Sequence, residues 1–447
     1  MLPVPGLAYP AEMMTNTAVA DGSHPPTTYS AIQLFLQAAQ RSAPGFAVDW
    51  PAIATICQLV DGLPLGIELA AAWVRALPCS DIAQEIGRNF DFLTAQWRDL
   101  PARHRSLRAV FDHSWALLTD AEQAIFRQLA IFRGSFDRAA AAAVTGAGLA
   151  QLVTLADKSL LRRLENGRYT IPEALRTFAA AKRRQRPHEQ QAVARRHGRY
   201  FADLLQQWEP HLKGGRQTET LAAISTDIEN MRRAWEWAVQ ERDTAVLAQS
   251  LASLALFYEM RSYFEEGLTA FQQAAQSLKR DAETAVLHAR LLAWQGRFSH
   301  RLGRYDAARA LLEESLAILD DTAQADIAFA ANNLGYVAWS QGQYDTAQAH
   351  YQRSLTIYRQ LNDKWGQSHV LNNLAILPQN LAQTRALLQE SRAIAQEIAD
   401  LWGLARVLNN LGIVTEERQA ARQLYRESAA ICQQIGDRFL STFPLTN

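Results

Sequence analysis

The sequence predicts a mostly α-helical protein that contains a helical domain, a winged-helix domain with one β-hairpin, and a solenoid of helical hairpins. Three observations lead to this prediction. Apolar residues recur at helical spacing along most of the 447 residues. One Asn-Gly pair separates two short extended runs, which is the pattern of a β-hairpin. Two short phrases recur in the C-terminal half every 37 to 40 residues, and such a period is typical of stacked helical hairpins.

The composition is that of an ordinary globular protein. Hydrophobic residues make up 48% of the chain and the formal net charge is zero, so no overall field favours nucleic acid or an anionic membrane. The cysteines Cys57, Cys79 and Cys432 fit no metal or disulfide spacing. No apolar run approaches the roughly 20 residues of a membrane span, and no leader sequence opens the chain. We expect a cytoplasmic protein without a metal site or a membrane contact.

The N-terminal part is predicted to be a linker followed by a helical domain. Residues 1–27 are rich in proline and have little periodicity, so we expect an extended linker. Residues 28–99 are predicted to form the helical domain. Its first helix begins near Tyr29, and its second follows Asp49 with a proline in the first turn. A third helix follows Asp61-Gly62-Leu63-Pro64-Leu65.

Residues 100–184 are predicted to form the winged-helix domain. Several helical patterns come first, the Asn166-Gly167 turn follows between two extended runs, and one more helix leads out. The helix before the turn, at 148–158, carries one basic and one acidic residue. A recognition helix needs several groups for phosphates and base edges, so we expect no specific DNA binding. The predicted helices cover residues 106–117, 120–132, 136–145, 148–158 and 173–184.

Residues 185–244 are predicted to be a helical linker with a break at Gly214-Gly215, residues 245–437 to be helical repeats, and residues 438–447 to be a tail. In the repeats, Gly335 is followed by Gly342-Gln343-Tyr344 and by Ala347. This spacing resembles that of tetratricopeptide (TPR) repeats, in which small residues stand where two helices cross closely. The last two repeats are three residues shorter and lack the Gly-x-Tyr turn.

The first recurring phrase, Asn-Asn-Leu followed by Gly or Ala, supplies the candidate binding residues. Amide side chains on the inner helix of each repeat can donate to and accept from an extended peptide backbone. The phrase resembles the Leu-Asn-Asn-Leu of kinesin light chain repeats, in which such asparagines line the cargo groove. The alternative is that the amides bond to neighbouring helices and only fix the repeat geometry. The predicted peptide-binding residues are Asn332, Asn333, Asn372, Asn373, Asn409 and Asn410.

The first half of the chain resembles a second family. Asp61-Gly62-Leu63-Pro64-Leu65 is similar to the GLPL motif of the NB-ARC nucleotide switches, which belong to the STAND class of signalling ATPases. The resemblance covers about residues 1–182, and bacterial members often continue into tetratricopeptide repeats. It implies a helical domain and a winged helix in a regulatory protein. Further matches are Arg103-His104-Arg105-Ser106-Leu107-Arg108, Ser114-Trp115, Phe132-Arg133-Gly134-Ser135-Phe136, Leu160-Leu161 and Arg168-Tyr169.

The chain departs from this family where the nucleotide chemistry would be. A P-loop needs a lysine after a glycine, and none of the five lysines follows one. Pro172 stands where the family has a histidine that senses the nucleotide phosphate. Pro64 would then be a vestigial contact to adenine. We expect no cofactor, with ATP or ADP bound only if a nucleotide domain is supplied elsewhere. On this reading the chain begins just after the place where such a domain would end.

These observations predict a non-enzymatic regulatory or adaptor protein that recognises a protein or peptide partner on the concave face of its repeats. It would be the sensor half of a STAND-type signalling ATPase. No histidine pair has zinc spacing, and no recognisable nucleophile is present, which disfavours an enzyme. The alternative is a truncated piece of an ATP- or ADP-dependent transcriptional regulator. In that case its nucleotide-binding and DNA-binding parts would lie outside this chain.

Overall fold

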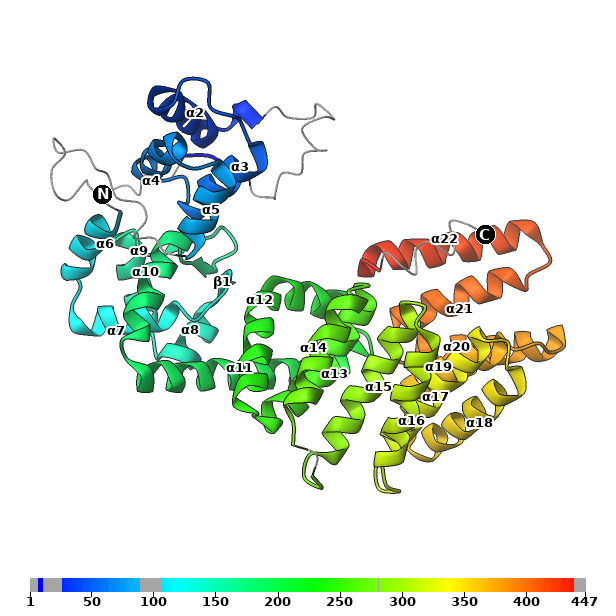
Figure 1. The fold of residues 1–447 in the computed structure, drawn as a ribbon. Coiled ribbons are helices and arrows are strands. Elements are labelled where there is room, and N and C mark those ends of the chain that lie inside the picture. Colours follow the sequence, from blue (N-terminus) through cyan, green and yellow to red (C-terminus); the bar gives the residue numbers. More distant parts are fainter. Residues whose placement is uncertain (1–6, 11–25, 89–106, 280, 438–447) are drawn as a thin grey trace. The chain divides into compact units, whose positions relative to one another are not determined.

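The computed structural model describes residues 7–10, 26–88, 107–279 and 281–437. The chain forms two compact units, Met1–His197 and Gly198–Asn447, which are almost entirely helical (Figure 1). The all-α prediction is therefore confirmed. Most of the predicted linker at 1–27, residues 103–106 of the second family resemblance and the predicted tail at 438–447 lie outside the described residues.

The first unit begins with four helices around a small apolar core. They bury Ile32, Phe35 and Ile53 completely. Asp49 is the N-cap of the second helix, where its side chain accepts a hydrogen bond from the backbone N–H of Ala52 at 3.1 Å. The helices are α2 (Ser30–Ser42), α3 (Trp50–Leu59), α4 (Pro64–Ala71) and α5 (Cys79–Arg88), with short 3-10 turns at Pro26–Thr28 and Ala72–Arg75.

Between residues 107 and 184, the first unit contains five further helices and a small sheet. The predicted hairpin is confirmed, because β2 (Arg162–Arg163) pairs antiparallel with β3 (Tyr169–Thr170). The prediction of a single hairpin is incomplete, since β1 (Ser135–Phe136) pairs with the other side of β3. A two-residue strand is too short to show alternation in the sequence. The helices are α6 (Leu107–Ala116), α7 (Asp120–Leu129), α8 (Arg138–Thr145), α9 (Leu149–Asp157) and α10 (Glu173–Arg184).

Two long helices occupy the segment that was predicted to be a helical linker. They are α11 (Pro187–Leu212) and α12 (Gln217–Glu241), and the break between them falls at the predicted Gly214-Gly215. The division between the two units, after His197, lies inside α11. Helix α12 packs against the first helical hairpin of the second unit, so most of this segment belongs to the repeat unit.

Five helical hairpins complete the second unit, and consecutive hairpins pack side by side (Figure 1). The first helix of each hairpin contacts the first helix of the next hairpin, while the second helix packs against the first helix of its own hairpin. We call the surface formed by the first helices the concave face. The hairpins are α13 (Thr244–Met260) with α14 (Phe264–Ser277), α15 (Ala285–Arg301) with α16 (Tyr305–Ile318), α17 (Gln324–Ser340) with α18 (Tyr344–Gln360), α19 (Lys364–Ala375) with α20 (Leu381–Glu397), and α21 (Leu401–Ile413) with α22 (Arg418–Ile435).

The glycines of the repeat pattern stand where the helices of a hairpin cross, as the sequence predicts. A Cβ atom added to Gly335 would come within 2.7 Å of the Tyr351 ring. Ala347, which also belongs to this crossing, is fully buried. Gly342 has a φ of +75° in the turn between α17 and α18, a conformation that glycine adopts without the strain of a side chain. These small residues therefore determine how closely the two helices of the hairpin approach each other, and they allow the turn between them.

The serine of the second recurring phrase holds the two helices of each of the last four hairpins in register. All four serines are fully buried, and each hydroxyl donates to a backbone carbonyl on the first helix of its own hairpin. Since a buried hydroxyl needs a partner, this bond explains why the phrase recurs. The bonds run from Ser315 to Ala289 (2.8 Å), Ser354 to Ala328 (2.7 Å), Ser391 to Ser368 (2.7 Å) and Ser428 to Ala405 (2.8 Å).

The three residues missing from the last two repeats are missing from the end of the inner helix. Helix α17 continues to Ser340, well beyond its crossing residue Gly335. Helix α19, in contrast, ends at its crossing residue Ala375. Helix α21 ends at Ile413, one residue after Gly412. The deletion therefore removes about one helical turn from the concave face of each shortened repeat.

The three cysteines are buried and form no disulfide. Among the described residues, no single helix is both long and apolar enough to cross a membrane. The bent pair of helices Arg138–Thr145 and Leu149–Asp157 meets that test only when both are taken together.

Candidate functional site

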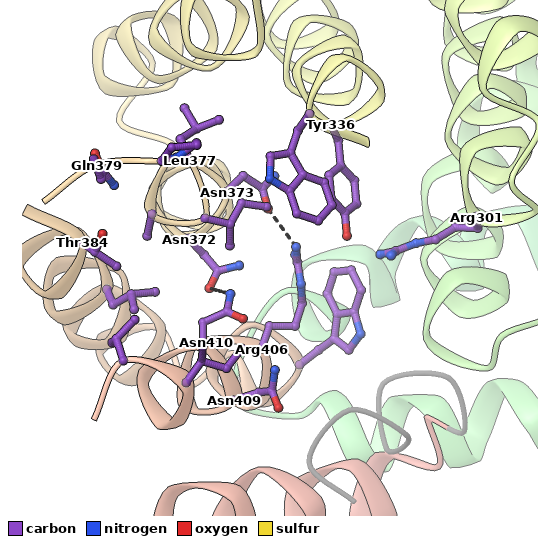
Figure 2. A pocket seen from close by; sticks show the side chains of 18 of the residues that line it. Arg301, Tyr336, Asn372, Asn373, Leu377, Gln379, Thr384, Arg406, Asn409 and Asn410 are labelled. Carbon is purple, nitrogen blue, oxygen red and sulfur yellow. Dashed lines mark hydrogen bonds between the residues drawn. The ribbon is translucent and has the colours of Figure 1, made fainter. Parts of the chain in front are cut away.

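The concave face of the second unit contains a cavity of about 550 Å³ (Figure 2). Every one of the five hairpins contributes to its wall, from Glu259 on α13 to Ile413 on α21. Asp437, which follows the last helix, also lines it. Small-molecule sites typically enclose about 300–1,000 Å³, so the cavity has room for a compact organic ligand or a short segment of a partner.

The shortened repeats create part of this space. Leu377, Pro378 and Gln379, which follow the early end of α19, line the cavity. Ile413 and Val414, at the end of α21, line it as well. In the longer hairpin, α17 continues through this level for one more turn. The deletion that is visible in the sequence therefore exposes apolar residues toward the concave face.

Four of the six predicted asparagines line the cavity, namely Asn372, Asn373, Asn409 and Asn410. Their amides form a ladder between helices, in which the second asparagine of one repeat donates to the first asparagine of the preceding repeat (Figure 2). The bonds join Asn373 Nδ2 to Asn332 Oδ1 at 2.9 Å and Asn410 Nδ2 to Asn372 Oδ1 at 2.9 Å. Hydrogen bonding between neighbouring helices was the alternative that the sequence left open.

The side chains of Asn332 and Asn333 form hydrogen bonds inside the protein and do not line the cavity. Asn333 is 3% exposed. It donates to the carbonyl of Phe329 at 2.8 Å and accepts from Arg297 Nη1 at 3.0 Å. Among the cavity asparagines, Asn410 is the more exposed, and the buried Oδ1 of Asn409 has no hydrogen bond to another described residue. Peptide binding by the six asparagines stays a prediction.

Arg406 on α21 brings a positive charge to the cavity (Figure 2). Its Nη1 donates to His369 Nδ1 at 2.8 Å, and its Nη2 donates to Asn373 Oδ1 at 2.9 Å. The guanidinium carbon lies 5.2 Å from the ring centre of Trp402. Burial lowers the pKa of Arg406 to about 10, so the group remains charged at neutral pH. No ion pair of Arg406 with a described carboxylate is formed within 4.0 Å.

His369 connects Arg406 to a buried carboxylate. Because a guanidinium only donates, His369 Nδ1 must accept, and the ring proton lies on Nε2. That nitrogen is 3.1 Å from Asp400 Oδ2, and Asp400 is 0% exposed. Burial lowers the pKa of His369, although the neighbouring Asp400 opposes this shift. The imidazole is therefore a neutral bridge between the Arg406 cation and the Asp400 anion.

A second charged group lies at the Glu259 wall of the cavity. Glu259 Oε1 accepts from Arg297 Nη2 at 2.8 Å and from Arg301 Nε at 2.8 Å. Burial by itself raises the pKa of Glu259, but the two guanidinium groups outweigh it and hold the pKa at about 2. Two arginines thus share one carboxylate oxygen, while Arg406 is bonded to neutral partners.

Arg406 was not predicted from the sequence as a site residue, and neither were His369, Arg301 and Glu259. The repeat pattern contained one indication of the contact between His369 and Arg406. His369 and Arg406 occupy the same position in successive repeats, six residues before Ala375 and Gly412. Two polar residues at one inward-facing position indicate a polar contact inside the solenoid.

In the first unit, Pro64 is exposed at the first turn of α4. The neighbouring Asp61 is buried and has a φ of +53°. It accepts from Arg162 Nη2 on β2 at 2.7 Å and from the hydroxyl of Tyr9 at 2.6 Å. The GLPL-like segment therefore anchors the helical part to the small sheet. The vestigial nucleotide contact of Pro64 stays a prediction.

Sequence comparisons find tetratricopeptide repeats and bacterial relatives. The tetratricopeptide repeat family model matches residues 326–377. A protein named as an HTH-type transcriptional regulator is 31% identical over 364 residues in Mycobacterium bovis and also in Mycobacterium tuberculosis. The alignment covers 77% of this chain but 41% of each relative. An uncharacterised protein of Mycobacterium bovis is 32% identical over 171 residues, which are 35% of this chain and 43% of that protein.

Two solved structures are similar in fold. One is a STAND protein with a tetratricopeptide repeat sensor from Pyrococcus horikoshii, at a TM-score of 0.43 and 13% identity over 93% of this chain and 62% of that chain. The other is BtubC from P. vanneervenii, at a TM-score of 0.34 and 20% identity over 48% of this chain and 89% of that chain.

Proposed function

We propose that this chain is a non-enzymatic regulatory protein whose repeat unit recognises a partner on its concave face. The observation that carries the proposal is the cavity, which joins an arginine that forms no direct ion pair with a described carboxylate, a ladder of amides and apolar residues in one surface. A few convergent polar groups in an otherwise apolar cavity are typical of a binding site. A protein or peptide partner, which the repeat pattern predicts, would insert a short segment there.

The first unit is proposed to contact protein rather than DNA. Helix α9, which precedes the hairpin, exposes the apolar side chains of Leu149 and Val153. Lys158 at its end is paired with Glu122 at 2.7 Å, and Arg162 in the hairpin is paired with Asp61. Basic groups that are already paired have less to offer to phosphates. Absence of a promoter footprint at physiological salt would support this part of the proposal.

A second candidate function is a part of a transcriptional regulator, in which the nucleotide-binding and DNA-binding regions lie outside this chain. The relatives named as HTH-type transcriptional regulators favour it, because the chain spans 41% of their length. Calorimetry of the chain with ATP and with ADP tests the cofactor part. We expect no binding at micromolar concentrations, and a micromolar dissociation constant for either nucleotide would contradict the expectation that this chain has no nucleotide cofactor.

The concave-face proposal is tested by blocking the cavity. The Asn410→Trp variant fills the cavity at a partly exposed position, while Gln352→Trp adds the same side chain to the exposed face of α18. Partners captured by the native chain are identified, purified and titrated against the three proteins. We expect Asn410→Trp to weaken the dissociation constant at least tenfold and Gln352→Trp to leave it unchanged. Equal affinities for all three proteins would place recognition elsewhere.

A further inference from the structure

We propose that the cavity selects a compact organic acid, whose carboxylate binds Arg406 and whose aromatic or apolar body lies against the shortened ends of α19 and α21. This inference rests on the proposed recognition by the concave face, and it specifies the chemistry of the occupant. It follows from the charge of Arg406, from the composition of the cavity walls, and from the contact between the first and last hairpins of the repeat unit.

Arg406 has N–H donors that its described contacts do not use. A guanidinium has five N–H donors, and the described contacts of Arg406 use two of them, on His369 and Asn373. Both acceptors are neutral, since burial holds the pKa of His369 below its ordinary value. Arg297 and Arg301 share Glu259, so this carboxylate is already paired with two other cations. An incoming carboxylate would accept hydrogen bonds from the donors that Arg406 does not use in its described contacts.

The cavity wall formed by the ends of α19 and α21 is apolar. Leu377, Ile376 and Pro378 follow α19 and face the cavity together with Ile413. Figure 2 places Leu377 and Thr384 on one side of the cavity and Tyr336 and Arg301 on the other, with Arg406 between them. A ligand that reaches from Arg406 to this apolar wall must carry an apolar or aromatic group beside its acid.

The amides of Asn372, Asn373 and Asn410 already form hydrogen bonds with other residues of the protein. Asn373 accepts from Arg406 and donates to Asn332, and Asn372 accepts from Asn410. These groups are therefore partly used within the protein, which leaves few of them for the repeated backbone bonds of an extended peptide. Asn410 is partly exposed in the cavity, and its remaining hydrogen-bonding capacity suits a single polar group of a small ligand.

The first and last hairpins of the repeat unit contact each other through Asp437. Asp437, after the last helix, accepts from Trp402 Nε1 at 2.9 Å and from the Ser262 hydroxyl at 3.3 Å. Ser262 lies in the turn of the first hairpin. The first and last hairpins thus meet at the cavity, and an extended chain running along the solenoid would encounter this contact. A compact ligand fits inside without breaking it.

Pairs of acids and neutral amides provide the test. Phenylacetate, indole-3-acetate and 1-naphthylacetate are titrated into the full chain by calorimetry, each beside its uncharged amide, with thermal melting as the second readout. We expect at least one acid to bind, and to bind at least tenfold more tightly than its amide. Equal binding of acid and amide would overturn the charge assignment. Binding of no acid, while Asn410→Trp still weakens the binding of the partner at least tenfold, would overturn this inference alone.

Variants then locate the charge. Arg406→Gln keeps a hydrogen-bond donor but removes the cation, and we expect it to reduce the acid-to-amide ratio to about one. Arg353→Gln on the exposed face of α18 is the matched control and should leave the ratio unchanged. If Arg406→Gln does not fold, Asn410→Asp adds a carboxylate to the cavity at a partly exposed position and should weaken acid binding at least tenfold. An acid preference that persists in a folded variant of either kind would refute the role of Arg406.

Discussion

Gln217 and Asp400 are 183 residues apart in the sequence, and their side chains are joined by a buried hydrogen bond of 3.1 Å. Gln217 is the first residue of α12, before the repeats begin, and Asp400 is the N-cap of α21 in the last hairpin. Gln217 Oε1 also accepts from the backbone N–H of Trp402 at 2.8 Å. Through Asp400 and His369, this contact continues to Arg406 at the cavity.

We expect Gln217→Ala to lower the free energy of unfolding of the repeat unit by about 1–3 kcal/mol, because it leaves the buried Asp400 oxygen and the Trp402 N–H without a partner. Urea denaturation followed by tryptophan fluorescence measures the change. Gln352→Ala, on the exposed face of α18, is the control and should change stability by less than about 0.5 kcal/mol. Equal effects of the two substitutions would mean that the contact does not stabilise the fold.

The close crossing of α17 and α18 leads to a second prediction. Gly335→Ala places a Cβ atom 2.7 Å from the Tyr351 ring, and we expect this overpacking to lower stability by about 1–3 kcal/mol. Gly87 lies in α5 with no heavy atom within 4 Å of its added Cβ. Gly87→Ala should therefore raise the stability of the first unit by about 0.5–1 kcal/mol through helix propensity. Chemical denaturation of both variants measures the two signs, and a stabilising Gly335→Ala would contradict the packing argument.

Acidification should destabilise the repeat unit through its buried histidines. Burial lowers the pKa of His369 in the folded state, and it lowers that of His300 to about 3. Below their ordinary value of 6.5 the unfolded chain takes up protons that the folded chain does not. Stability is therefore complete above that pH and falls as the pH is lowered, by up to about 1.4 kcal/mol per pH unit for each proton.

The matched variants are His369→Gln and His188→Gln, of which the second lies at an exposed position. Denaturation between pH 7 and pH 5 should give a smaller slope for His369→Gln than for the native chain, while His188→Gln should reproduce the native slope. Identical slopes for all three proteins would show that His369 takes up its proton equally in the folded and unfolded states.

The asparagine ladder gives a fourth prediction, which separates structural from binding roles. Asn373→Ala removes the acceptor of Arg406 and the donor to Asn332, so we expect a loss of about 2 kcal/mol or more. Asn409→Ala removes a side chain whose buried Oδ1 has no partner among the described residues, and should cost less. Denaturation ranks the two variants. Equal losses would show that the inter-repeat bonds contribute little to stability.

Much of the fold can be predicted because its causes are local. Asp49 caps α3 from within four residues, and Asn166-Gly167 turns the hairpin between adjacent strands. The repeat period is also visible, since the last four hairpins share a small residue at the helix crossing and a buried serine. Strand β1 could not be predicted, because Phe136 gains its partner Tyr169 only when distant segments meet.

The sequence by itself determined the helices, their hairpin period and the shortening of the last two repeats, because spacing, caps and small residues act within one hairpin. The tertiary structure alone decided which side chains share the cavity. Arg406 meets His369 from another hairpin, and Glu259 meets Arg297 and Arg301 from the next one. Those contacts depend on the angle at which hairpins stack and on the closure between Gln217 and Asp400. No local pattern encodes that geometry, since it is the sum of many small packing angles along the solenoid.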